Sequence, residues 1–353
     1  MRLTKLLMIA VAVLAVLYTE NAVAATRTPE VACKIEALDW YAPTEPITVR
    51  FSLENRSAES IWVLRWQMPS DEIDANIFEI TRNGEAVQYV GPLVKRAEPI
   101  AEDYVEIRAG QAFEVAFDPS AVYDMTAQGQ YSIRYRVRML DVRSEAPGSE
   151  PAAPPMLRAK VIESSPIGLW FEGLDRPAGP VREIDQIIGG YTKCTTSQQA
   201  SMQTAHNSAV SISNKAISHL ASNPNGSSLY TYWFGTYTSS RFNTVKAHYN
   251  SIWDAFVNKS VVYDCGCKKR YYAYVYPNQP YKIYVCKVFW TAPNLGRDSR
   301  AGTLVHEMSH FYVTASTDDY VYGATGAHNL AVSDPTKAID NADNHEYFAE
   351  DQP

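Results

Sequence analysis

Short segments in which apolar and polar residues alternate dominate the first half of the chain. This alternation has the two-residue period of a β-strand that buries one face. Turn-forming residues separate the segments, of which the clearest span 47–53, 61–64, 105–107 and 131–137. Many short strands at a regular interval are typical of a β-sandwich. The pattern predicts an all-β, immunoglobulin-like sandwich over residues 25–163, in which nothing has the composition of a catalytic site.

The second half of the chain has a different pattern, with long stretches that contain few helix breakers and short apolar runs between them. Helices are predicted over residues 195–222 and 241–257, in the segment that contains residue 306, and over about 336–350. Strands are predicted over residues 261–265, 271–276 and 282–289. This mixture predicts an α+β domain over residues 191–353, with a small sheet beside helices.

Residues 164–190 separate the two halves. They contain Pro166, Pro177 and Pro180 and end in the pair Gly189-Gly190. Such a composition is typical of an exposed linker between domains. We therefore expect the domain boundary, and the cut that matures the protein, within this segment.

The N-terminus has the three parts of a secretory signal peptide. Arg2 and Lys5 supply the positive region, residues 6–17 form an apolar run, and residues 22–24 form an A-x-A cleavage site. We expect a signal peptide over residues 1–24 and a secreted, extracellular product. The apolar run is short for a transmembrane span and no second long run follows, so we expect no membrane insertion after signal removal.

The net charge of the chain limits the classes of molecule that it is expected to bind. The formal charge of −7 and the pI of about 5.6 argue against nucleic acid and anionic membranes as partners. We expect a monomer that acts on other molecules.

Five cysteines in an exported protein predict disulfides with one cysteine left over. A bond between Cys265 and Cys267 would be strained because a single residue separates them. These two are expected to pair outward, one with Cys194 and one with Cys286, which leaves Cys33. A zinc site built on Cys265 and Cys267 is the competing interpretation.

The sequence His306-Glu307-Met308-Ser309-His310 carries the strongest chemical signal of the chain. On a helix, residues four apart lie on one face, so both imidazoles can bind one zinc ion. Glu307 then lies beside the metal, where a carboxylate can take a proton from water. A helix that carries two histidines by chance is the alternative.

A catalytic zinc site needs a third protein ligand and an open position. A third His six residues after His310 is excluded, because Ser316 occupies that position. Asp319, nine residues after His310, is one candidate. Glu346 or Glu350, from a later helix in a gluzincin-like arrangement, is the other.

Residues 316–323 resemble the G-T-x-D-x-x-Y-G motif of the aspzincins, the deuterolysin-type zinc metalloendopeptidases. The match holds at Thr317, Asp319, Tyr322 and Gly323, and it departs at Ser316, where the family motif has Gly. The resemblance implies a zincin-type fold, one Zn²⁺ held by two histidines and Asp319, and Tyr322 as the donor to the oxyanion. Glu307 would be the general base.

Within this family, residues 190–353 are most similar to the peptidyl-Lys metalloendopeptidases, with further matching segments at 232–235, 272–278 and 341–348. The resemblance implies the disulfides Cys194–Cys265 and Cys267–Cys286. It also implies protein or peptide substrates that are cut before lysine. The front half resembles the β-sandwich propeptides of secreted bacterial relatives, which implies a zymogen whose propeptide inhibits its own enzyme.

Asp343 and Glu346 are three residues apart, so on a helix they project to the same side. Two neighbouring carboxylates are costly unless a cation neutralises them. The family similarity assigns this pair to the pocket that binds the substrate lysine. A solvated acidic helix face is the alternative.

Residues 91–99 of the front half predict a proline-bounded loop between strands. A loop can present one side chain to a cleft. Lys95 has the charge that the Asp343 and Glu346 pocket requires, so we hypothesise that it plugs this pocket in the zymogen; a solvated loop lysine is the alternative. A secreted binding or toxin protein with a decayed protease domain is the competing function for the whole chain.

Overall fold

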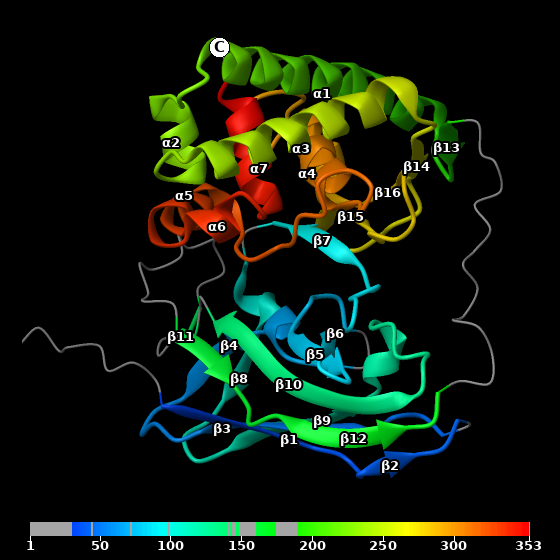
Figure 1. Ribbon diagram of the computed structural model, residues 1–353, viewed down its shortest axis with the longest axis vertical. Helices are drawn as coiled ribbons and strands as arrows, with labels where there is room; N and C mark the ends of the chain where they lie inside the picture. The colour runs from blue at the N-terminus through cyan, green and yellow to red at the C-terminus, as the bar shows by residue number, and fades with distance from the viewer. Residues whose placement is uncertain are drawn as a thin grey trace, which may run out of the picture.

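The computed structural model describes residues 30–43, 45–70, 73–97, 99–139, 142, 146–147, 160–173 and 189–352. The protein consists of a β-rich front region and a mainly helical second region, which lie against each other (Figure 1). Each region has its own hydrophobic core. The predicted signal peptide, and residues 174–188 of the predicted linker, lie outside the described residues.

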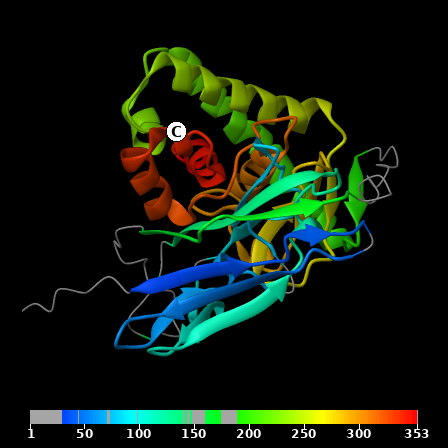
Figure 2. The same cartoon turned by 60° about the horizontal axis from the view of Figure 1, so that its bottom comes forward.

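The front region is built from two layers of strands around one core (Figure 2). One sheet has the order β1 (Val31–Glu36), β3 (Val49–Asn55), β9 (Ala112–Phe117). The other has the order β2 (Trp40–Tyr41), β12 (Ile167–Phe171), β10 (Gly129–Met139), β5 (Phe78–Arg82), β6 (Glu85–Ala86), with β11 (Lys160–Glu163) beside β10. A separate pair joins β4 (Ile61–Leu64) to β8 (Tyr104–Ile107). In β3 every second residue is buried, as the alternating pattern predicts.

The second region places a sheet beside helices, so the predicted α+β arrangement is confirmed. Its helices are α1 (Thr196–Ser222), α2 (Ser228–Phe234), α3 (Ser239–Asn258), α4 (Arg300–His310), α5 (Gly323–Ser333), α6 (Pro335–Ala338) and α7 (Ala342–Glu350). Its own strands are β13 (Gly190–Thr192), β14 (Val262–Asp264), β15 (Tyr271–Val275) and β16 (Lys282–Val285). Helix α4 packs against α1 and α7 in the centre of this region.

Helix boundaries follow local capping signals. Thr195 and Gln198 form a capping box at the start of α1. The Ser299 side chain accepts the backbone N–H of Gly302 at the start of α4. The predicted helix over 336–350 is instead two helices, because the chain turns between α6 and α7 at Ile339 and Asp340. The predicted strand over 282–289 ends at Val285 and is followed by a 3₁₀ turn.

The segment predicted as a loop over residues 91–99 contains a strand, β7 (Leu93–Arg96), so that prediction was wrong. This front-region strand pairs antiparallel with β15 and completes the sheet β13-β14-β16-β15-β7 (Figure 1). All four of its residues are buried, so β7 lacks the alternation that marks a strand with one wet face. An edge strand contributed by another region is the β-augmentation mode of peptide binding.

The front region also extends further than predicted. Strand β12 falls inside the expected linker but pairs with β10 and β2, because its apolar residues Leu169 and Phe171 are buried in the front core. The boundary at residue 163 is therefore too early, and the front region reaches at least Phe171. No helix within the described residues is both long and apolar enough to cross a membrane.

Candidate active site

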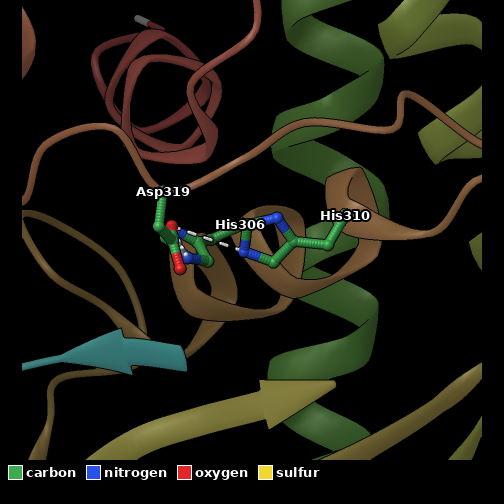
Figure 3. Close-up of side chains that lie close together, drawn as sticks. All are labelled: His306, His310 and Asp319. Carbon is green, nitrogen blue, oxygen red and sulfur yellow. Dashed lines mark ion pairs between the residues drawn. The ribbon is translucent and has the colours of Figure 1, made fainter. Parts of the chain in front are cut away.

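Helix α4 carries His306 and His310 one turn apart, as their spacing predicts (Figure 3). Every residue from Ala301 to His310 is buried, so both imidazoles point into protein rather than solvent. His310 Nδ1 is 2.9 Å from the backbone oxygen of Thr317. When this nitrogen carries the proton and donates it to that carbonyl, Nε2 remains free as a ligand atom.

After α4 the chain reverses its direction, which places Asp319 beside His306 and His310. Ser316 has a φ of 54°, the left-handed region that glycine adopts with least strain, so the serine here keeps the turn of the family motif. The Thr317 hydroxyl is 2.6 Å from that of Ser309, which ties the returning segment to α4. Asp319 Oδ1 then lies 3.2 Å from His306 Nε2 and 3.5 Å from His310 Nε2.

These three atoms fit a zinc site. Ligands held about 2.0–2.1 Å from zinc in a tetrahedron are about 3.4 Å apart, close to both distances from Asp319 Oδ1. The three residues form one of two clusters of potential metal ligands within the described part of the chain. The charges of His310 and His306 lower the pKa of Asp319 in spite of its burial, which keeps it in the anionic form that a metal ligand needs.

The second cluster joins His306 to Asp343 and Glu346. Here the contacts are to the other ring nitrogen: His306 Nδ1 is 2.8 Å from Asp343 Oδ1 and 3.3 Å from Glu346 Oε2. Glu346 therefore lies on the far side of the imidazole from Asp319. Glu350, the other rival third ligand, accepts the backbone N–H of Ser299 instead. The side chains that could bind one metal ion together with both histidines therefore include Asp319, and neither Glu346 nor Glu350.

Glu307 is fully buried beside the two histidines. Burial raises the pKa of its carboxyl to about 7, although the charges of His306 and His310 and the backbone N–H of Lys95 act in the opposite direction. A carboxyl whose pKa lies near neutrality can both accept and return a proton, which is what a general base requires.

Tyr322 precedes α5 and lies near Asp319, so the structure brings it to the same site. Burial and the Asp319 charge raise its pKa well above the ordinary value, so its hydroxyl stays protonated and able to donate. The next residue, Gly323, donates its N–H to Asp343 Oδ2 at 2.6 Å. Asp343 thus contacts both the tyrosine turn and a histidine of α4.

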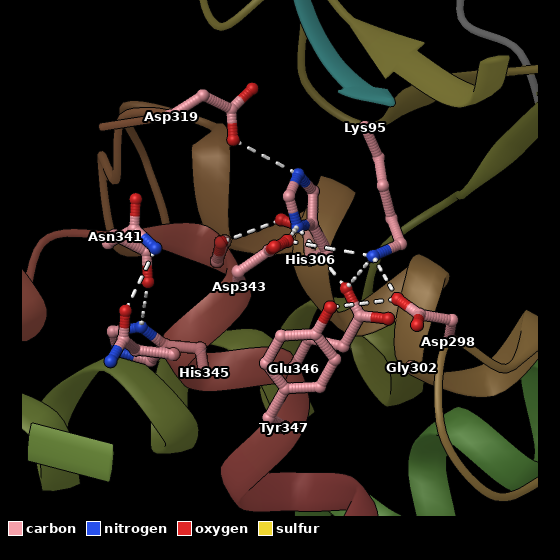
Figure 4. A network of polar contacts seen from close by, with 12 residues as sticks. Lys95, Asp298, Gly302, His306, Asp319, Asn341, Asp343, His345, Glu346 and Tyr347 are labelled. Atoms are coloured by element: carbon pink, nitrogen blue, oxygen red, sulfur yellow. Dashed lines mark hydrogen bonds and ion pairs between the residues drawn. The ribbon is translucent and has the colours of Figure 1, made fainter. Parts of the chain in front are cut away.

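Lys95 of β7 enters the second region at the acidic cluster (Figure 4). Its Nζ lies 2.6 Å from Glu346 Oε2, 3.2 Å from Asp298 Oδ1 and 3.6 Å from Asp343 Oδ1. The side chain is 2% exposed, and the rings of Tyr272 and Tyr347 lie within 5.1 and 5.5 Å of Nζ. The nearby carboxylates raise the pKa of Lys95 well above its ordinary value although burial opposes the charge.

The backbone of β7 also reaches the catalytic residues. The Val94 N–H donates to Asp319 Oδ2 at 3.2 Å, and the Lys95 N–H approaches Glu307. Arg96 is buried, and its Cζ lies 4.7 Å from the centre of the Trp66 ring and 5.0 Å from that of Tyr271. The front region therefore covers the candidate active site with one continuous strand.

Several residues of this site were missed by the sequence analysis. Tyr347 could have been found, because it lies on the same helical face as Asp343 and Glu346. Asp298 and Tyr272 lie in a turn and at a strand irregularity, where no pattern marks them.

The disulfides are Cys194–Cys265 and Cys267–Cys286, the pairs that the family resemblance implies. They link the segments that directly follow β13, β14 and β16. Cys33 is a free, half-buried thiol on β1, whose burial raises its pKa to about 12. The four bonded cysteines are therefore structural, and their bonds exclude the competing zinc site on Cys265 and Cys267.

Comparison with known proteins gives a consistent result. A family model described as lysine-specific metallo-endopeptidase matches residues 219–350. An extracellular protease of Aeromonas hydrophila is 43% identical over 318 residues, which cover 88% of this chain and 89% of that protein. A peptidyl-Lys metalloendopeptidase of Grifola frondosa is 32% identical over 94% of this chain and 96% of that protein. A solved zinc peptidase of Grifola frondosa, 45% identical, covers 45% of this chain and 98% of its own with a TM-score of 0.44. The long match to the Aeromonas protease, together with the family model, shows that the chain belongs to the aspzincin family of metalloendopeptidases.

Proposed function

We propose that this metalloendopeptidase is secreted as a zymogen, binds one zinc ion through His306, His310 and Asp319, and cuts peptide bonds on the N-terminal side of lysine. The observation that carries the proposal is the position of Lys95. Its ammonium is buried among carboxylates while its backbone N–H lies beside Glu307. A lysine in a substrate can make the same contacts, with the bond before it at the catalytic residues.

The chain's residues divide the chemistry among them. When bound, zinc lowers the pKa of a water molecule and polarises the scissile carbonyl. Glu307 accepts the proton of the attacking water and passes it to the leaving amine, which is the backbone nitrogen of the lysine. Tyr322 donates a hydrogen bond to the oxyanion that develops on the carbonyl.

Lysine selectivity has a simple electrostatic basis. Without a cation, Asp343 and Glu346 face each other in a buried pocket, which is unfavourable. A compact ammonium relieves this repulsion, whereas a planar guanidinium has a different shape and fits a narrow pocket poorly. The names of the relatives agree, since several are called peptidyl-Lys metalloendopeptidases.

We propose that the front region, from about residue 25 to at least Phe171, is an immunoglobulin-like propeptide that inhibits the enzyme and assists its folding. Strand β7 occupies the sheet edge where a substrate strand would bind, and Lys95 occupies the lysine pocket. A cut within residues 174–188 would detach it. The disulfides and the name of the Aeromonas relative agree with an extracellular location. A decayed, non-enzymatic protein is not favoured, because Glu307 and all three ligand residues are present.

The test is a digest of a denatured protein by the secreted, processed form. New N-termini should begin mainly with lysine, activity should disappear with a chelator, and zinc should restore it. A Glu307→Ala form purified in parallel controls for contaminating proteases. Cleavage without a lysine preference would reject the pocket, and chelator-resistant cleavage would reject the zinc site. N-terminal sequencing of the same sample locates the maturation cut.

A further inference from the structure

Three carboxylates, rather than two, surround the Lys95 ammonium (Figure 4). Two of them are close: Glu346 Oε2 at 2.6 Å and Asp298 Oδ1 at 3.2 Å. Asp343 Oδ1 is at 3.6 Å, beyond a good hydrogen bond. The direct partners of the ammonium are therefore Glu346 and a residue of the turn before α4.

Asp343 makes its closest contacts with His306 and Gly323 rather than with the Lys95 ammonium. Its Oδ1 is 2.8 Å from His306 Nδ1, which is shorter than its distance to the ammonium. Its Oδ2 accepts the Gly323 N–H at 2.6 Å, directly after Tyr322. A carboxylate this close to the outer nitrogen of a ligating histidine favours the tautomer that leaves the other nitrogen for the metal. Asp343 therefore positions His306 and the tyrosine turn.

Asp298 is held in place by α7. Its oxygen Oδ1 accepts the Tyr347 hydroxyl at 2.8 Å, and its backbone N–H donates to Glu350 Oε2 at 3.1 Å. Its φ of 50° lies in the left-handed region, which aspartate and asparagine tolerate better than most other non-glycine residues. These contacts aim the carboxylate at the ammonium.

Glu350 anchors the same turn a second time. Its Oε1 accepts both the N–H and the hydroxyl of Ser299, at 2.8 and 2.7 Å. Gly302 permits this approach, because a Cβ at that position would collide with the Glu350 carboxylate. The turn that carries Asp298 is thus fixed by a residue that makes no contact with the lysine.

We propose that Asp298 is a specificity-determining residue that binds the substrate lysine together with Glu346, and that Asp343, the third and most distant carboxylate of the pocket, also positions His306. This inference rests on the proposed cleavage before lysine and divides the roles within that pocket. Asp298 is the most exposed of the three carboxylates, with 37% of its side chain accessible, so it also marks the side from which the ammonium enters.

The experiment compares processed enzyme carrying Asp298→Asn or Asp343→Asn with wild type. Two fluorogenic peptides are used that differ only in lysine or norleucine after the cut, because norleucine has a similar length without the charge. Zinc affinity is measured separately by competition with a chelator. Asp254→Asn, at an exposed position on α3, is the matched control.

Asp298→Asn should raise KM for the lysine peptide about ten- to a hundredfold, the usual effect of losing a hydrogen bond to a charged group. It should leave the norleucine peptide and zinc affinity unchanged. Asp343→Asn should lower zinc affinity about ten- to a hundredfold and lower kcat for both peptides alike. Asparagine tolerates a left-handed backbone, and Asp298→Gly provides a second variant without the carboxylate if the first folds poorly.

A wild-type preference for lysine over norleucine that survives in both Asp298 variants would overturn the proposal. So would an Asp343→Asn enzyme that keeps its zinc affinity and loses only the lysine preference. If wild type itself shows no preference for lysine, the proposed function fails first, so the two failures are distinguishable.

Discussion

Replacing Lys95 with methionine should greatly weaken inhibition by the front region. The side chain is 2% exposed and its nearest partner, Glu346, is 0% exposed, whereas its second close partner, Asp298, is 37% exposed. Methionine nearly fills the same volume, so the change removes the charge and leaves Glu346 buried without a cation. Removing one partner of a buried ion pair costs about 3–5 kcal/mol. That range corresponds to an inhibition constant about a hundredfold to a few thousandfold higher.

The assay adds purified front region, residues 25–182, to processed enzyme and measures hydrolysis of a lysine peptide at increasing concentrations. The matched control is Lys34→Met, because Lys34 lies on β1 with its side chain 68% exposed and pairs with the similarly accessible Glu36. Surface ion pairs of this kind contribute little, so the control should inhibit like wild type.

Equal inhibition by the wild-type and Lys95→Met forms would refute the role of Lys95 and assign inhibition to the β7 backbone alone. Absence of inhibition by both forms, with each shown to be folded, would leave the front region with a role in folding or targeting only.

Three further outcomes are expected. Glu307→Gln should retain zinc, measured by metal analysis, and lose about 10²- to 10⁴-fold in kcat, because it removes the base and no ligand; high activity in a zinc-loaded variant would contradict this. Asp319→Ala should lose zinc as well as activity, whereas Glu346→Ala should keep its zinc, and the reverse result would make the glutamate the third ligand. His248 Nδ1 lies 3.1 Å from His345 Nε2, and burial lowers the pKa of His248 to about 4. The unfolded chain therefore takes up a proton near pH 6.5 that the folded protein refuses, so stability should fall by about 3 kcal/mol as the pH drops from 6.5 to 4. Urea unfolding at several pH values measures this loss, and a curve equally steep in His248→Gln would argue against it.

The candidate metal site was accessible to sequence reasoning because its geometry is local. Two histidines four residues apart must share a helix face, and Asp319 follows within one short return of the chain. The alternation in β3 likewise reports a strand with one buried face. In both cases the spacing of residues along the sequence determines which side chains lie on the same face of the helix or strand.

Strand β7 shows where this reasoning fails. Its four residues are buried because two regions of the protein enclose it, one on each side. A period-two pattern appears only when one face of a strand meets water, so Leu93–Arg96 carries no such mark. Lys95 could be proposed from its chemistry, but its pairing opposite Ala273 follows only from the tertiary structure.

Asp298 could not be predicted from the sequence either, because only the tertiary structure brings its turn to the lysine pocket. Helix α7 holds this turn in place through Tyr347 and Glu350. Asp343, Glu346, Tyr347 and Glu350 follow the spacing of one helical face on α7, and together they contact His306, the lysine ammonium and the turn before α4. Glu346 Oε2 lies 2.6 Å from the ammonium and 3.3 Å from His306 Nδ1, so the lysine pocket and the imidazole share one carboxylate. A substrate without the ammonium leaves that buried carboxylate short of positive charge directly behind a candidate metal ligand. Loss of the lysine should therefore lower kcat as well as raise KM, because the residue that recognises the substrate also bears on the catalytic centre.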